Sequence, residues 1–204
     1  MKRVGIIQPN YIPWRGYFDF IDDVDLFIFL ADVQYTDRDW RNRNRIATPR
    51  GLVWLTVPVE RGPRTRRICE TRIAGSWQDD HLNRLRLSYG KTPHFRRYIE
   101  SFEERIREPH LTIADLDIAL CVWIMSELGI RTPTMIASEM DVGGSKDERL
   151  IALLRKVGAD AYLSGPRGAD YLDPERFRTN GIRLEYKSYD YEPYPRPHPI
   201  DGEA

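Results

Sequence analysis

The stretch Gly5–Phe18, GIIQPNYIPWRGYF, begins as an apolar run and then changes abruptly into a loop rich in polar and aromatic side chains. The run Val4–Gln8 predicts a short buried strand, and Trp14–Ile21 has the pattern of a helix. Polar groups held at the end of a buried strand cost free energy unless they find partners. The stretch therefore predicts a strand–loop–helix unit whose loop carries a site.

The composition is that of a globular protein, with 204 residues, 41% hydrophobic and 30% charged. Cys69 and Cys121 have no CxxC spacing and no metal signature, so we expect reduced thiols and a cytoplasmic location. The basic start of the chain has too short an apolar run for a signal peptide, and no run approaches the length of a membrane span. We expect no membrane association.

Positive charge gathers in one part of the chain. Between Arg38 and Arg72 there are ten arginines and three acidic residues, although the formal net charge of the whole chain is zero. Such an excess can hold a phosphate or another anion, and a solvated, salt-bridged surface is the alternative. Because aromatic residues are not regularly interleaved, we expect a small anion rather than a long nucleic acid.

Further apolar runs predict an α/β protein with a mainly parallel open sheet of Rossmann-like type. Expected strands lie at Asp25–Ala31, Leu52–Val59 and three later runs, TPTMIAS, DAYLSG and IRLEYKSY. Helix-start signals stand at Thr112, at Asp173-Pro174 and at a capping box, Ser145–Glu148. We expect one domain over 1–194, a helical insert over about 76–129, and a proline-rich tail over 195–204.

Ligands of open α/β sheets bind at the carboxyl ends of the strands, where three polar clusters are expected to meet. Each cluster also has a plainer interpretation, as a turn, a solvated loop or a cap on the core. The four histidines are scattered without metal-binding spacing, so no metal site is predicted. The candidate residues are Gln8, Asn10, Tyr11 and Trp14, then Asp32, Gln34, Tyr35, Arg43 and Asn44, and finally Ser164 and Arg167.

Five motifs in order, GIIQPNYIPWRGYFDFI, DVQYTDRDWRNRNRI, WLTVPV, AYLSGPRGADYL and GIRLEYKSYDYEPY, resemble the WbqC-like protein family. The resemblance covers about residues 3–194. It implies a role in the biosynthesis of O-antigen, another surface polysaccharide or a natural product. It further implies transfer of an aminoacyl group, such as glycyl, to an amino sugar. The ending PRPHPIDGEA differs from the apolar helix with which family members continue.

The first loop also resembles a degenerate HxGH loop of nucleotidyltransferases of the HUP-like class, with Gly16 retained and both histidines replaced. In that resemblance GGSKDERL corresponds to a late phosphate-binding motif, which places Lys146 among the candidate residues. The resemblance implies ATP as a cofactor. The missing histidines favour instead a donor that is already activated, such as an acyl thioester or an aminoacyl-tRNA.

These observations predict an acyl- or aminoacyl-type transferase acting on a small amine, such as a nucleotide-linked amino sugar. Asp32 is the expected base and Tyr35 its catalytic neighbour, because an amine loses a proton when it attacks a carbonyl group. Arg43, Asn44 and Lys146 are expected to hold phosphate or carboxylate. The alternatives are a non-catalytic sugar-nucleotide-binding protein, an adenylating ligase and a nucleic-acid binder; among partners, tRNA is not favoured over a small molecule.

Overall fold

The structure is a computed structural model that describes residues 1–192 and 194–198. Of the predicted tail over 195–204, the part 199–204 lies outside the described residues. The chain forms two compact units, each built from several segments and each described here by itself. The sheet unit comprises Met1–Pro9, Pro13–Val33 and Ile124–Asp190. The hairpin unit comprises Asn10–Ile12, Gln34–Trp123 and the segment from Tyr191 onward.

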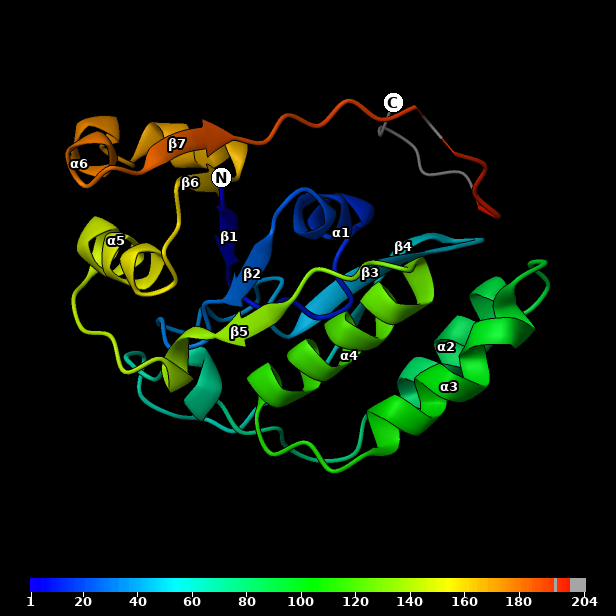
Figure 1. Ribbon diagram of the computed structural model, residues 1–204. Helices are drawn as coiled ribbons and strands as arrows, with labels where there is room; N and C mark the ends of the chain where they lie inside the picture. Colours follow the sequence, from blue (N-terminus) through cyan, green and yellow to red (C-terminus); the bar gives the residue numbers. More distant parts are fainter. Residues whose placement is uncertain (193, 199–204) are drawn as a thin grey trace. The chain divides into compact units, whose positions relative to one another are not determined.

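A five-stranded sheet forms the centre of the sheet unit, and every pairing in it is parallel (Figure 1). The strand order is β5-β2-β1-β6-β7, which in chain order along this sheet is 3-2-1-4-5, the order of the first five strands of Rossmann folds. The prediction of a mainly parallel, Rossmann-like sheet is therefore confirmed. The strands are β1 (Arg3–Ile7), β2 (Leu26–Phe29), β5 (Thr134–Ile136), β6 (Ala161–Ser164) and β7 (Arg183–Tyr186).

Both faces of this sheet are buried, because successive side chains of a strand point to opposite faces. Val4 and Ile6 pack in a core with Leu154 and Phe177, which belong to the helices α5 and α6. On the other face, a Cβ atom on Gly5 would lie 2.5 Å from the Phe20 ring of α1, so only glycine lets that helix approach. This two-sided burial explains why β1 and β2 are continuous apolar runs.

The helices of the sheet unit begin close to their predicted starts. Asp173 caps α6 by accepting a hydrogen bond from the Glu175 amide at 3.0 Å. Ser145 does precede α5, but its side chain makes no capping hydrogen bond, so the predicted capping box is wrong in its bonding. The elements are α1 (Arg15–Asp22), η2 (Ala137–Glu139), α5 (Lys146–Lys156), η3 (Pro166–Asp170) and α6 (Pro174–Thr179).

The hairpin unit corrects one strand prediction. The run Leu52–Val59 does not join the parallel sheet: β4 (Gly51–Thr56) pairs antiparallel with β3 (Arg43–Thr48) in a separate two-stranded sheet. The run looked like a doubly buried strand because Trp54 is apolar, yet Trp54 is 40% exposed and lies against the Arg43 guanidinium. Pairing with an arginine-rich partner strand allows an apolar strand to keep one face in solvent.

Three helices follow the hairpin. The prediction at Thr112 is confirmed, because its hydroxyl accepts from the Asp115 amide at 3.2 Å while the Asp115 carboxylate accepts from the Thr112 amide at 2.9 Å. The last part of α4 belongs to the sheet unit. The elements are η1 (Ile68–Glu70), α2 (Gln78–Tyr89), α3 (Phe95–Arg107) and α4 (Ile113–Leu128).

Candidate functional site

The carboxyl edge of the parallel sheet gathers the predicted residues that belong to the sheet unit. Because all five strands run the same way, the segments that follow them emerge at one edge. After β1 the chain continues to β2 on one side of β1, and after β6 it continues to β7 on the opposite side of the sheet. The topological switch point, where the direction of the strand order reverses, therefore lies between β1 and β6. The predicted residues on these segments are Gln8, Asp32, Lys146, Ser164 and Arg167.

A partly buried ion pair lies at this edge, beyond the end of β2. Asp32 is 8% exposed, and its Oδ2 accepts a hydrogen bond from the Arg149 guanidinium, which comes from α5. Arg149 also donates to the carbonyl of Ala137, just after β5. The second carboxylate oxygen, Oδ1, is buried and has no hydrogen-bond partner among the described residues. Such an oxygen is an acceptor that a donor from a ligand can satisfy.

The loop between η2 and α5 makes a tight turn just before α5 begins. Gly144 has φ +98°, and a Cβ atom there would lie 3.2 Å from the Arg149 amide nitrogen. Lys146 follows with φ +49° and an exposed side chain. The loop therefore fixes the backbone that carries Arg149 while leaving the Lys146 ammonium in solvent.

The last residue of β6, Ser164, is approached closely by the backbone of Gly168. Ser164 is buried, and a Cβ atom on Gly168 would lie 2.1 Å from its Oγ. The Ser164 carbonyl accepts from the Lys187 amide at 2.9 Å, just beyond β7. Arg167, in the 3-10 helix between them, is exposed. Gly168 is thus required for the position of the Ser164 hydroxyl at the switch point.

Two predicted residues from the opening stretch lie next to α1. The Gln8 carbonyl accepts from the Tyr17 hydroxyl at 3.1 Å, which fixes the backbone at the end of β1. Trp14 is 52% exposed, and its ring meets Tyr189 edge-on with the centroids 4.9 Å apart. Trp14 therefore covers the start of α1 together with the segment after β7.

Tyr11 lies inside the hairpin unit and is fully buried. Its hydroxyl is 2.8 Å from Nδ1 of His81, while Nε2 of His81 is 3.2 Å from the Thr56 carbonyl. The carbonyl can only accept, so Nε2 carries the proton and the Tyr11 hydroxyl donates to Nδ1. Burial lowers the pKa of His81 to about 4, which keeps the ring neutral at neutral pH. The substrate-binding role of Tyr11 stays a prediction.

Asn10 and Asn44 hold the same loop segment within the hairpin unit. The Asn10 side-chain oxygen accepts from Arg41, and the Asn44 amide nitrogen donates to the carbonyls of Tyr11 and Ile12. Ile12 has φ +44°, a strained conformation for a β-branched residue, so these bonds support a costly turn.

Arg43, which is also predicted to bind an anion, is the first residue of β3 and directly precedes Asn44. Its guanidinium stacks 4.0 Å above the Trp54 ring and donates to the Arg38 carbonyl. Asn44 is likewise occupied by backbone groups, since its oxygen accepts from the Arg45 amide at 2.7 Å. Both side chains thus have intramolecular partners, and their role toward phosphate stays a prediction.

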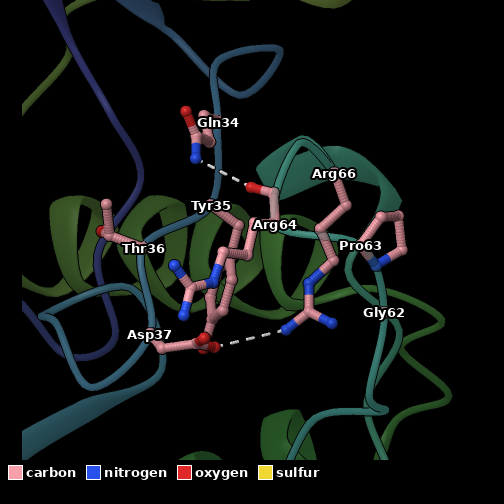
Figure 2. A pocket seen from close by; sticks show the side chains of 8 residues that line it. All are labelled: Gln34, Tyr35, Thr36, Asp37, Gly62, Pro63, Arg64 and Arg66. Carbon is pink, nitrogen blue, oxygen red and sulfur yellow. Dashed lines mark hydrogen bonds and ion pairs between the residues drawn. The ribbon is translucent and has the colours of Figure 1, made fainter.

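Gln34 and Tyr35 line a cavity of 320 Å³ in the hairpin unit (Figure 2). A loop rich in arginine forms its other wall, and two backbone contacts fix that loop: the Tyr35 amide donates to the Arg66 carbonyl at 2.9 Å, and the Gln34 side chain donates to the Arg64 carbonyl at 2.8 Å. The lining residues are Gln34, Tyr35, Thr36, Asp37, Gly62, Pro63, Arg64 and Arg66.

The Arg66 guanidinium and the Tyr35 phenol are hydrogen-bonding groups of this cavity. The Arg66 guanidinium lies 4.7 Å from the Tyr35 ring centroid and donates to the Glu60 carbonyl at 2.8 Å. Burial raises the pKa of Tyr35 to about 12, with a further rise from Asp37 and an opposing effect from Arg66. The phenol is therefore a neutral hydrogen-bond donor near pH 7.

The sequence reasoning missed several residues of these sites. Arg149, the partner of Asp32, lies in the helix that follows the predicted capping box, and no local pattern links it to a residue 117 positions away. Arg64 and Arg66 were visible only as part of the arginine excess over 38–72, which was the available signal.

Among the described residues no group of His, Cys, Asp and Glu is placed to hold a metal ion. Within the same residues, no helix has the length and apolar character needed to cross a bilayer.

The sheet order and its carboxyl edge define the class: an α/β protein with a Rossmann-like, mainly parallel open sheet. The chain belongs to the WbqC-like protein family, whose model matches residues 8–199. It is 42% identical over 193 residues to the uncharacterized protein Rv1507c of Mycobacterium tuberculosis, an alignment that covers 93% of this chain and 84% of that protein. No solved structure matches the chain significantly.

Proposed function

We propose that this protein transfers an acyl or aminoacyl group, such as glycyl, to the amine of a small acceptor, a nucleotide-linked amino sugar. The observation that carries the proposal is the Asp32 carboxylate at the carboxyl edge of the sheet. One of its oxygens is held by Arg149, and the other is buried without a donor. An N–H group of a bound ligand supplies the missing donor.

The position of Asp32 fits a nucleotide-linked ligand. Nucleotides bind Rossmann-like sheets at the carboxyl edge near the switch point, which here lies beside Gln8 and Ser164. In the proposal, these two side chains hydrogen-bond the sugar, and Lys146 and Arg167 contact the phosphates. Both cations are exposed and belong to segments that follow strands of this edge.

The reaction joins the acceptor nitrogen to the acyl carbonyl carbon. The N–C bond forms and the C–O or C–S bond to the donor's carrier breaks. The carrier leaves as an alcohol or thiol that takes up a proton or, where ATP has first activated glycine with release of pyrophosphate, as AMP. Asp32 Oδ1 receives the proton that the amine loses, as a general base. The predicted catalytic role of Tyr35, which belongs to the hairpin unit, stays a prediction that a Tyr35→Phe variant tests separately.

The rival function is a non-catalytic sugar-nucleotide-binding protein. In dinucleotide-binding sheets an acidic residue near the end of the second strand binds a ribose hydroxyl. Asp32 follows β2 closely, so its free oxygen fits that role as well. The two functions differ in what a change of Asp32 does to binding and to turnover.

The deciding experiment offers the protein a UDP-linked amino sugar with three donors in turn: acetyl-coenzyme A, glycyl-tRNA, and glycine with ATP. Mass spectrometry detects the amide product, and calorimetry measures UDP-sugar affinity. We expect product from the wild type, and from Asp32→Asn at least tenfold less product with unchanged affinity. Asp22→Asn, an exposed change in the same unit, is the control. The rival function, a non-catalytic sugar-nucleotide-binding protein, would be established if the wild type formed no product with any donor and Asp32→Asn lost affinity for the UDP-sugar.

A further inference from the structure

The cavity between Gln34–Asp37 and Gly62–Arg66 has the chemistry of an anion site. Two of its lining residues are arginines and one is an aspartate, so its wall carries an excess of one positive charge. Its volume of 320 Å³ lies at the lower end of small-molecule sites, which span about 300–1,000 Å³. A small charged group therefore fits it.

Arg66 is built into this wall. Its side chain is 12% exposed, and its Nε is buried with no hydrogen-bond partner among the described residues. The Tyr35 ring and the Glu60 carbonyl hold the rest of the guanidinium in place. A buried donor that lacks an acceptor marks a place where an acceptor from a ligand gains a hydrogen bond.

The carboxylate nearest to Arg66 satisfies it poorly. Asp37 is 75% exposed, and its Oδ1 lies 3.4 Å from Arg66 Nη2, at the long limit of a hydrogen bond. Ion pairs as exposed as this contribute about 0–1 kcal/mol. Asp37 can therefore be displaced from Arg66 at little cost.

Arg64 supplies a second cation that is not neutralised. It is exposed and makes no ion pair with any described residue. Figure 2 shows the Arg64 and Arg66 side chains extending from their loop toward Tyr35 and Asp37. Two guanidinium groups beside a phenol donor match a group with two negative charges and several acceptor oxygens.

A second cavity, of 360 Å³, is lined by residues of the same loop and shares Gly62, Pro63 and Arg66 with the first. Of its lining arginines, Arg72 pairs with Glu60 at 3.6 Å. Arg61 is the cation of this second cavity that makes no ion pair among the described residues. It offers a neighbouring control for the first cavity.

We propose that the cavity lined by Tyr35, Arg64 and Arg66 binds the phosphate group of a small ligand. Phosphate is favoured over carboxylate because its double charge suits two guanidinium groups, each able to donate two parallel hydrogen bonds. The proposal concerns the hairpin unit alone and stands or falls apart from the transferase function.

The test measures pyrophosphate binding to the full chain by isothermal titration calorimetry, with inorganic phosphate and acetate as further probes. We expect saturable pyrophosphate binding, weakened about tenfold or more in Arg64→Gln, since a charge-assisted contact is lost. Arg50→Gln removes the same charge from the hairpin turn of the same unit, and Arg61→Gln removes it from the second cavity. Arg50→Gln should bind within about twofold of the wild type, because an exposed charge outside the cavity is screened. Arg61→Gln, next to Gly62 of the cavity lining, should lose clearly less affinity than Arg64→Gln.

A variant with the opposite expected sign strengthens the test. Asp37→Asn removes the weakly held carboxylate beside Arg66 and should tighten pyrophosphate binding several-fold. Thermal unfolding confirms that each variant is folded. Equal losses in all three arginine variants would mean general charge attraction and would overturn the proposal. Unchanged binding in Arg64→Gln, or acetate binding as tight as phosphate, would overturn it too.

Discussion

The Tyr11 hydroxyl donates a hydrogen bond to Nδ1 of His81 across 2.8 Å, and both residues are almost completely shielded from solvent. The loop that leaves the first strand is thereby tied to helix α2, although the two partners are 70 positions apart in the sequence. This bond, with that of His81 to the Thr56 carbonyl, requires an uncharged imidazole. Protonation of His81 is therefore coupled to the stability of the fold.

The first prediction concerns acid stability. The pKa of His81 is lowered by burial from 6.5 to about 4, so the unfolded state binds more protons between these values. The stabilisation is fully present above pH 6.5 and is lost as the pH falls toward 4, by about 3 kcal/mol at most. We expect His81→Gln to lose much of this pH dependence, measured by urea unfolding from pH 4 to 8.

His94→Gln is the matched control, because His94 is exposed in the same unit. It should follow the wild-type curve throughout. If His81→Gln and the wild type lose equal stability between pH 6.5 and 4, the neutral state of His81 is not what the fold requires.

The second prediction concerns Asp117 of helix α4, whose contribution to stability changes with pH in the direction opposite to that of His81. Asp117 is fully buried, neither of its oxygens has a partner among the described residues, and burial raises its pKa far above the usual value, with Arg41 opposing. The folded state therefore binds more protons, and the contribution of Asp117 to stability falls as the pH rises above about 4.

Asp117→Asn stays neutral at every pH and should gain stability over the wild type as the pH rises, by about 1–3 kcal/mol at pH 8. Guanidinium unfolding at pH 4, 6 and 8 measures the difference. Glu104→Gln, an exposed change on α3, should show no such gain. A constant difference between Asp117→Asn and the wild type across this range would contradict the assignment.

The third prediction uses the close approach of Gly168 to Ser164 at the switch point. Gly168→Ala places a methyl group 2.1 Å from Ser164 Oγ, which should destabilise the sheet unit by about 1–3 kcal/mol. Ser164→Ala removes that oxygen, so the double variant should recover part of the loss. A double-mutant cycle of unfolding free energies measures the coupling, and strictly additive losses would show that the two positions do not interact.

The fourth prediction concerns the contact between the end of β7 and helix α1. The Lys187 ammonium, with 10% of the side chain exposed, is paired with Asp19 at 2.7 Å and with Asp23. Lys187→Met removes the ammonium group that these two carboxylates share and should cost about 1–2 kcal/mol, because both carboxylates are partly exposed. Arg155→Gln, an exposed loss of charge in the same unit, should change stability little. Thermal unfolding compares the two, and an equally small effect of Lys187→Met would show that the contact contributes nothing.

The sequence by itself determined the parallel sheet and the helix starts, because these depend on local patterns. Doubly buried strands such as β1 and β2 must be continuous apolar runs, and Thr112 and Asp173 cap helices through atoms only two or three residues away. The gathering of Asp32 and Ser164 at one edge followed from parallel strands alone.

The tertiary structure decided which polar side chains have partners, since partners far apart in the chain leave no local signal. Tyr11 reads as a loop residue, but contact with His81 makes it part of the core. Asp32 reads as a free carboxylate, yet Arg149, 117 positions away, holds one of its oxygens. The antiparallel pairing of β4 and the position of Arg66 over Tyr35 depend in the same way on long-range contacts, whose energies no short stretch of sequence contains.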